Sequence, residues 1–279
     1  MTVHWLGEPD CHRTERVGGK AASLSQLAGE FEVPDGFAIP AVTVPVAEVV
    51  AEALATEVAE AYGVLEQRAG MVDLPVAVRS SAIDEDGAQA SFAGQHETYL
   101  NVRGAEAVFD AVRRCWASAH SEVAIQYRKM SGLSADDIQM AVLVQQLVEA
   151  DVAGVAFSAN PVTGNRDEVM ITTSWGLGES VVSGTVTPDM FVVHKQTLVV
   201  TAEVGAKERM TALHEGGTHE VPVPPEQQAQ LTLSEDQARE VAALAHRLEQ
   251  SMGFPVDIEC AYRAGQLYLL QCRPITTLS

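Results

Sequence analysis

The residues best suited to chemistry in this chain lie near its C-terminus, in two segments with the pattern of β-strands. Asp257 and Glu259 alternate with apolar residues in the first segment, and the second carries Gln271 and Arg273. This alternation predicts strands, and the Ala-Gly dipeptide between them predicts a hairpin turn. Carboxylate and amide oxygens are ligands that Mg²⁺ accepts, and a guanidinium binds phosphate oxygens. The hairpin is therefore a candidate site for a metal-bound phosphate.

The length of the hairpin loop decides whether Glu259 and Gln271 can act together. A three-residue loop, with Gly265 at a positive φ, places Glu259 directly opposite Gln271 and both side chains on one face. A two-residue loop places them on opposite faces. We expect the three-residue loop, with Arg273 on the same face as the pair. The alternative is a solvated sheet face with one ordinary ion pair, because any half-exposed strand alternates in this way.

Two basic residues in the N-terminal half are candidate phosphate ligands. Lys20 follows two glycines at the predicted start of a helix, where N–H groups and a lysine attract anions. This is not a Walker A loop, because the glycine spacing and the residue after the lysine both differ from that pattern. Arg79 ends a buried-type strand and precedes two hydroxyls. The alternatives are a surface lysine in a flexible turn and an arginine paired with Asp84 or Glu85.

The composition limits the classes of partner. There are 18 basic and 38 acidic side chains, a formal net charge of −20, which argues against nucleic acid or an anionic membrane as partner. The four cysteines show no C-x-x-C spacing and no secretory segment precedes them, so we expect a reduced, cytoplasmic setting. No apolar run approaches the roughly 20 residues of a membrane span. The histidines lack metal-ligand spacing, so we infer no zinc site.

Helical and strand patterns are mixed along the chain. Amphipathic helices are expected at about 44–68 and 104–130. A last helix is expected from Ser234 to Met252, with a capping box between Ser234 and Gln237 and with Gly253 as its stop. The glycine-rich segment at 176–178 lacks the third glycine of a dinucleotide fingerprint, so a Rossmann interpretation is poor.

Several short motifs, each weak alone, follow one another in a specific order. They are Gly18-Gly19-Lys20, 78–81, 91–95, 97–102, 175–179, Asp257-Ile258-Glu259 and Gln271-Cys272-Arg273-Pro274. In this order they resemble the ATP-binding domain of phosphoenolpyruvate synthase, pyruvate phosphate dikinase and rifampicin phosphotransferase. The resemblance covers nearly the whole chain. It implies an α+β, ATP-grasp-like fold with two lobes that close on Mg-ATP between them, which we expect at residues 1–140 and 141–279.

The resemblance also implies roles for individual residues, with ATP and Mg²⁺ as cofactors. Glu259 and Gln271 would bind Mg²⁺, and Lys20, Arg79 and Arg273 would act on the phosphates in catalysis. Phosphoryl transfer depends on positioning and on neutralisation of charge, which suits this set in a protein of net charge −20. Gln145 and its neighbours Gln146 and Val148 would flank adenine. The full set of implied nucleotide ligands is Lys20, Arg79, Thr98, Gln145, Gln146, Val148, Glu259, Gln271 and Arg273.

The chain departs from the family pattern in three places. Family members carry a mobile domain with a phosphorylatable histidine and a further domain for the acceptor, whereas this chain stops five residues after Pro274. We therefore expect no phosphohistidine domain in the chain and a histidine on a separate protein. Val123 stands where members usually have an arginine, which Arg113 or Arg114 could replace. The segment between Lys20 and Arg79 is also shorter than expected.

Three functional classes follow. The leading one is an ATP-dependent phosphotransferase component that passes a phosphoryl or pyrophosphoryl group to a separate histidine-bearing protein or to a small-molecule acceptor. The second is an ATP-grasp ligase that forms an acyl phosphate, and the third is a non-catalytic nucleotide-binding regulatory subunit. The classes differ in product, because a dikinase-type reaction releases AMP, a direct kinase or ligase releases ADP, and a regulatory subunit releases neither.

Overall fold

The computed structural model describes residues 2–44, 48–83, 97–130 and 138–276. The chain divides into two compact units, unit 1 (Met1–Leu147 with Glu215–Gly217) and unit 2 (Val148–His214 with Thr218–Ser279). Both contain helices and strands, which confirms the α+β class. The expected boundary after residue 140 falls inside the strand Ile138–Gln146. Because that strand is central to the sheet of unit 1, the division comes after Leu147 instead.

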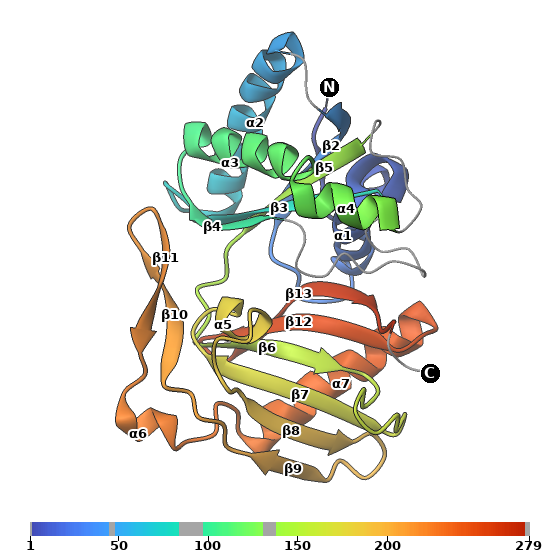
Figure 1. Ribbon diagram of the computed structural model, residues 1–279, viewed down its shortest axis with the longest axis vertical. Coiled ribbons are helices and arrows are strands. Elements are labelled where there is room, and N and C mark those ends of the chain that lie inside the picture. The colour runs from blue at the N-terminus through green and yellow to red at the C-terminus, as the bar shows by residue number, and fades with distance from the viewer. Residues whose placement is uncertain (1, 45–47, 84–96, 131–137, 277–279) are drawn as a thin grey trace. The chain divides into compact units, whose positions relative to one another are not determined.

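Unit 1 is built on a five-stranded antiparallel sheet with the order β1-β2-β5-β3-β4 (Figure 1). The central strand β5 pairs with β2 on one side and with β3 on the other. Both β3 and β5 are buried along most of their length, as their apolar runs predict. The strands are β1 (His4–Trp5), β2 (Gly36–Val44), β3 (Val76–Ala82), β4 (Thr98–Val102) and β5 (Ile138–Gln146).

Helices lie on both faces of this sheet. The main core joins Val76 and Val78 to α2 (Glu48–Ala69) and α3 (Ala105–Ser118). The alternate positions of β3 carry Arg79 and Ser81, and the Ser81 hydroxyl contacts α1 (Thr14–Leu27), so α1 lies on the face that carries Arg79. The 3-10 turn η1 (Pro9–His12) precedes α1.

The expected helix at about 104–130 is two helices, α3 and α4 (Glu122–Met130). The break follows from local hydrogen bonding, because the Ala119 N–H bonds to the Trp116 carbonyl at 3.2 Å in a tight turn. Ser121 Oγ then accepts from the Ala124 N–H at 3.2 Å, which is the contact of an N-cap residue. The side chain of Val123 and the segment from Asp84 to Gln95 lie outside what the structure describes.

Unit 2 is built on a six-stranded antiparallel sheet with the order β13-β12-β6-β7-β8-β9 (Figure 1). A separate two-stranded hairpin, two short helices and one long helix complete the unit. The sheet strands are β6 (Val152–Phe157), β7 (Glu168–Trp175), β8 (Asp189–His194), β9 (Val200–Glu203), β12 (Val256–Arg263) and β13 (Gln266–Pro274). The remaining elements are α5 (Glu179–Val182), β10 (Arg209–His214), β11 (Gly217–Pro222) and α6 (Pro225–Gln228).

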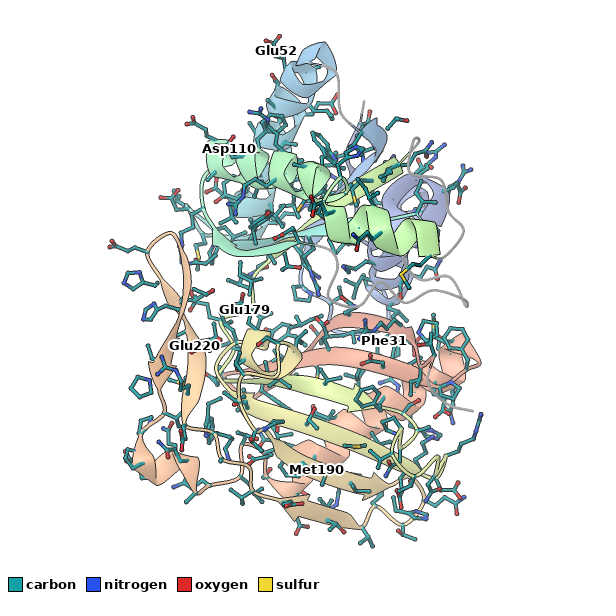
Figure 2. The ribbon with its side chains drawn as sticks, in the orientation of Figure 1. Phe31, Glu52, Asp110, Glu179, Met190 and Glu220 are labelled. Carbon is teal, nitrogen blue, oxygen red and sulfur yellow. The ribbon has the colours of Figure 1, made fainter. Side chains whose placement is uncertain are left out.

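The long helix α7 (Glu235–Met252) crosses one face of the six-stranded sheet and contacts β6, β7, β8, β9 and β12. Its capping box between Ser234 and Gln237 and the left-handed Gly253 at its end are both as expected. Ile258 and Cys272 point to the helix side and are buried. The other face, which we call the site face, carries half-buried side chains such as Met190, and Figure 2 shows Met190 on this face.

Candidate functional site

A glycine allows α1 to lie against the end of β3. Gly18 has φ 76° and ψ 168°, which breaks the helix just before Lys20, so the expected helix start behind the glycine pair is present as a kink. A Cβ at Gly18 would lie 2.1 Å from the Ser81 carbonyl oxygen. Only glycine fits such an approach at a positive φ. The Ala21 N–H, a donor expected at this helix start, bonds to Ser81 Oγ at 3.2 Å.

This contact brings Lys20 and Arg79 into one region of unit 1. Lys20 Nζ donates to the Ser80 carbonyl oxygen at 3.0 Å, and Ser80 directly follows Arg79. Both basic side chains are buried. Thr98 lies opposite Arg79 across the β3–β4 ladder and is exposed. An ammonium and a guanidinium in one region are groups that bind phosphate oxygens, so this cluster is suited to phosphate.

The residues expected to flank adenine lie at the end of β5 and just beyond it. The buried side chain of Gln145 donates through Nε2 to the Pro34 carbonyl oxygen at 3.1 Å. The Gln146 N–H bonds to the Asp35 carbonyl oxygen at 2.8 Å, and its side chain is half-buried. Val148 is half-buried and begins unit 2. Gln145 therefore ties β5 to the chain before β2, whereas Gln146 and Val148 are partly accessible.

The expected pairing of Glu259 with Gln271 is confirmed, but the expected loop is wrong. Arg263 pairs with Gln266, so the loop has two residues, and its Ala264 and Gly265 have φ 49° and 81°. The register then shifts between Glu259 and Cys260, where β13 carries an extra residue, and the shift brings Glu259 opposite Gln271. A β-bulge has this effect on side-chain direction. The shorter loop alone would place Glu259 opposite Leu270, and the extra residue in β13 restores the pairing with Gln271.

An ion pair lies beside Glu259 and Gln271 on the site face. Asp257 is directly opposite Arg273, and its Oδ2 accepts from Nε at 2.8 Å and lies 2.7 Å from Nη2. The side chain of Asp257 is 8% exposed and that of Arg273 is 30% exposed. Burial raises the pKa of Asp257 above its ordinary value, while Arg273 acts in the lowering direction and Glu259 in the raising direction. The alternative interpretation expected one ordinary ion pair on a solvated sheet face. The structure does contain an ion pair there, but its carboxylate is buried.

The arrangement on the site face fits Mg²⁺. Glu259 offers carboxylate oxygens and the opposite Gln271 offers an amide oxygen, and Mg²⁺ commonly takes one or two protein ligands together with water and substrate phosphates. Among the described residues, no group of three or more His, Cys, Asp and Glu could hold a metal ion by itself. The donor set therefore suits a cation shared with a phosphate ligand.

A pocket of about 450 Å³ opens in unit 2 at the other end of β12. Its lining includes Glu149, just after Val148, and the apolar side chains of Trp175, Leu177 and Met210. Arg263 also lines it and lies on the same face of β12 as Glu259, since residues two apart share a face. From Arg263 to Glu259 the strand spans about 13 Å.

Sequence reasoning missed the contact between Asp257 and Arg273, although the signal was available. Any register that places Glu259 opposite Gln271 also places Asp257 opposite Arg273, because the two pairs are two residues apart on each strand. It also missed the pocket, whose lining comes from separate parts of the chain.

A comparison with protein families shows which family the chain belongs to. Residues 42–279 match the family described as the pyruvate phosphate dikinase AMP/ATP-binding domain. The chain belongs to this family, which was expected from its motifs.

Individual relatives extend the comparison. A probable phosphoenolpyruvate synthase of Methanocaldococcus jannaschii is 40% identical over 271 residues, which cover 96% of this chain and 21% of the relative. A rifampicin phosphotransferase of Streptomyces sviceus is 38% identical over 98% of this chain and 36% of its own length. The chain thus spans well under half of these relatives. A D-alanine–D-alanine ligase from Bacillus anthracis aligns with 98% of this chain and 60% of its own at 9% identity and a TM-score of 0.41, too low to support an argument.

Two further observations concern the setting of the protein. In the part of the chain that the structure describes, no helix is both long and apolar enough to cross a bilayer. The four cysteines are all buried thiols in this structure. Burial raises the pKa of Cys11 to about 11 and that of Cys115 to about 12, so neither is a reactive thiolate near neutral pH. The cytoplasmic setting remains a prediction.

Proposed function

We propose that this chain binds Mg-ATP and is the ATP-dependent phosphotransferase component of a larger system. It passes a phosphoryl or pyrophosphoryl group to a histidine on a separate protein or to a small-molecule acceptor. The observation that carries this proposal is the pairing of Glu259 with Gln271 on a face that also holds Arg273, in a chain of the AMP/ATP-binding family. A metal ligand pair beside a guanidinium is what a metal-bound phosphate requires.

The residues of the two units have separate roles in this proposal. In unit 2, Glu259 and Gln271 hold Mg²⁺ and Arg273 contacts the transferring phosphate. In unit 1, Lys20 and Arg79 neutralise the phosphates, with Thr98 beside Arg79 as a hydroxyl donor. Mg²⁺ bound there supplies charge neutralisation at the phosphate oxygens. Such preorganised charges stabilise a transition state whose negative charge spreads over the transferring group.

The adenine end is supported by the pocket beside Glu149. Its apolar walls suit a purine, and about 13 Å of β12 separates it from Glu259, comparable with the length of an extended nucleotide. The proposal keeps Gln145, Gln146 and Val148 as neighbours of adenine, and Val148 directly precedes Glu149, which lines the pocket. Met210→Trp should fill the pocket and weaken ATP binding but not tripolyphosphate binding. Equal weakening of both ligands would remove the adenine assignment.

The site of attack on ATP decides the product. Attack of an acceptor lone pair on the β-phosphorus breaks its bond to the oxygen shared with the α-phosphorus, and AMP leaves with that oxygen. Attack on the γ-phosphorus breaks the bond to the β,γ-bridging oxygen, and ADP leaves. The acceptor's proton is lost to solvent or to a base in either case. The name of the Streptomyces relative, rifampicin phosphotransferase, supports a small-molecule acceptor as one of the two options.

The test is ³¹P NMR of the purified chain with Mg-ATP, first alone and then with an extract of its source cells. AMP that forms only with extract supports a dikinase-type system with a separate acceptor, and ADP supports direct phosphoryl transfer or an acyl-phosphate ligase. ATP binding without any product, in both samples, would favour the regulatory subunit.

Variants test the metal assignment in the same samples. Glu259→Ala and Gln271→Ala should each raise the Mg²⁺ concentration needed for ATP binding, with the fold intact. Glu235→Ala is the matched control, since Glu235 is an exposed glutamate on the helix α7. Wild-type behaviour of both site variants at limiting Mg²⁺ would refute the metal assignment.

A further inference from the structure

We propose that Asp257 is a positioning residue, which holds the Arg273 guanidinium in the orientation that meets the nucleotide phosphate. The inference rests on the proposed function and adds a residue to it. Asp257 itself does not touch the nucleotide in this proposal, because it acts through Arg273.

The geometry of the pair supports a positioning role. Nε of Arg273 donates to Oδ2 of Asp257 at 2.8 Å, and Nη2 lies 2.7 Å from the same oxygen. These two nitrogens form one edge of the planar guanidinium, so the contact fixes the plane of the group as well as its location. A lysine cannot reproduce this contact, because its ammonium is a point charge on a flexible stem.

The two partners differ in exposure, and the basic partner is the one nearer the solvent. Asp257 is 8% exposed, whereas Arg273 is 30% exposed, so the carboxylate lies below and the guanidinium reaches the surface of the site face. Glu259 and Gln271 lie on the same face, next along the two strands. The arginine therefore lies between its buried anchor and the place where the proposed metal-bound phosphate approaches.

A substitution can separate the charge of Asp257 from its shape. Asp257→Asn has nearly the same shape as the carboxylate and removes the negative charge that holds the guanidinium in the proposed orientation.

The test measures binding of Mg-ATP and of AMP by calorimetry, together with thermal unfolding, for the full chain and its variants. Asp257→Asn should weaken Mg-ATP binding about tenfold, the size expected for a charge-assisted hydrogen bond. AMP binding and the unfolding midpoint should not fall, because the adenine end and the fold do not depend on the pair. Asp236→Asn is the matched control, since Asp236 pairs with Arg239 at 2.8 Å on α7 and is highly exposed.

The same change in an Arg273→Lys background shows whether Asp257 acts through the arginine. The effect of Asp257→Asn on Mg-ATP binding should largely vanish there. An equal effect in both backgrounds would overturn the positioning role, as would a wild-type affinity for Asp257→Asn or a loss of AMP binding that matches a lower unfolding midpoint. A wild-type chain that binds no Mg-ATP would instead show that the proposed function itself fails, and this inference with it.

Discussion

Unit 2 contains two ion pairs with buried carboxylates, and their surroundings differ. Asp189 and Lys207 are both 0% exposed, and other groups surround them. Besides Lys207, Asp189 accepts from the Gly205 N–H at 2.8 Å and from the Thr232 N–H and hydroxyl at 2.7 and 2.8 Å. Lys207 also donates to the carbonyl oxygens of Gly205 and Gln228. The pair joins β8 to segments before and after the β10–β11 hairpin.

The pair of Asp257 and Arg273 lies nearer the surface. Nε and Nη2 of Arg273 lie 2.8 and 2.7 Å from one oxygen of Asp257, and the exposed fraction of the side chain rises from 8% at the acid to 30% at the base. A charge pair that backbone groups satisfy from several sides serves to fix the chain, since each partner is costly to remove. A pair with a buried acid and a partly exposed base instead places the positive charge where a ligand can reach it. The difference predicts opposite responses to mutation.

The largest effect is expected from Asp189→Ala. It leaves the ammonium of Lys207 buried without its carboxylate, which costs about 3–5 kcal/mol of unfolding free energy. Urea denaturation followed by circular dichroism measures this loss, with Asp236→Asn as the exposed control. A loss no larger than that of the control would show that the two pairs do not differ as described.

The second effect distinguishes two buried lysines, Lys20 and Lys207. Lys20 Nζ donates to the Ser80 carbonyl oxygen, and the proposal gives its charge a role at the phosphates rather than in the fold. Lys20→Met should remove about 2–4 kcal/mol of transition-state stabilisation, as for other preorganised donors, and so slow product formation. The free energy of unfolding should change little. Lys207→Met should lower the free energy of unfolding and leave the rate of product formation in the folded protein nearly unchanged. Parallel ³¹P kinetics and urea titrations separate the two outcomes, and a stability loss for Lys20→Met without a rate loss would contradict the phosphate role.

The sequence was sufficient for features that depend on local pattern. The capping box at Ser234 and the glycine stop at Gly253 follow from spacing alone. The pairing of Glu259 with Gln271 was also predicted, but for the wrong reason, because nothing local signals the extra residue at Leu270. A bulge is set by packing of the two strands against their neighbours, which a pattern of two does not report.

Other features could not be predicted because they join distant segments. Asp189 and Thr232 are far apart in sequence and outside any shared ladder, so no periodicity brings them together. The tight approach of Gly18 to Ser81 is of the same kind, although the glycine pair gave a hint of it. Lys20 and Arg79 were identified as separate candidates, and only the fold shows that α1 brings Lys20 to the residue after Arg79. Their joint action on ATP stays a proposal.

Ser234→Ala is expected to have a smaller effect that sharpens the comparison. It removes the hydroxyl that caps α7, which costs about 1 kcal/mol. Because α7 covers the face of the sheet opposite Glu259, Mg-ATP affinity well below the unfolding temperature should stay at the wild-type value. Denaturation and calorimetry on the same sample check this. Weaker ATP binding by this variant would mean that a loss of stability in unit 2 is enough to weaken the site. Weaker binding by Asp257→Asn would then not indicate a positioning role.

The smallest effect on stability is expected from Asp257→Asn, and its pH dependence has a definite sign. The pKa of Asp257 is raised in the folded protein above its ordinary value of 3.8. The stability that this carboxyl contributes is therefore fully present below the unfolded pKa and is lost as the pH rises through the folded pKa. Asparagine does not titrate, so wild type should exceed the variant in unfolding free energy by more near pH 4 than near pH 7. Urea titrations of both proteins at the two pH values measure this difference. The contributions of the other carboxylates to the unfolding free energy are the same in both proteins and cancel. A difference that grows with pH would show that attraction to Arg273 outweighs burial, and the pair would then stabilise the fold as the pair of Asp189 and Lys207 does.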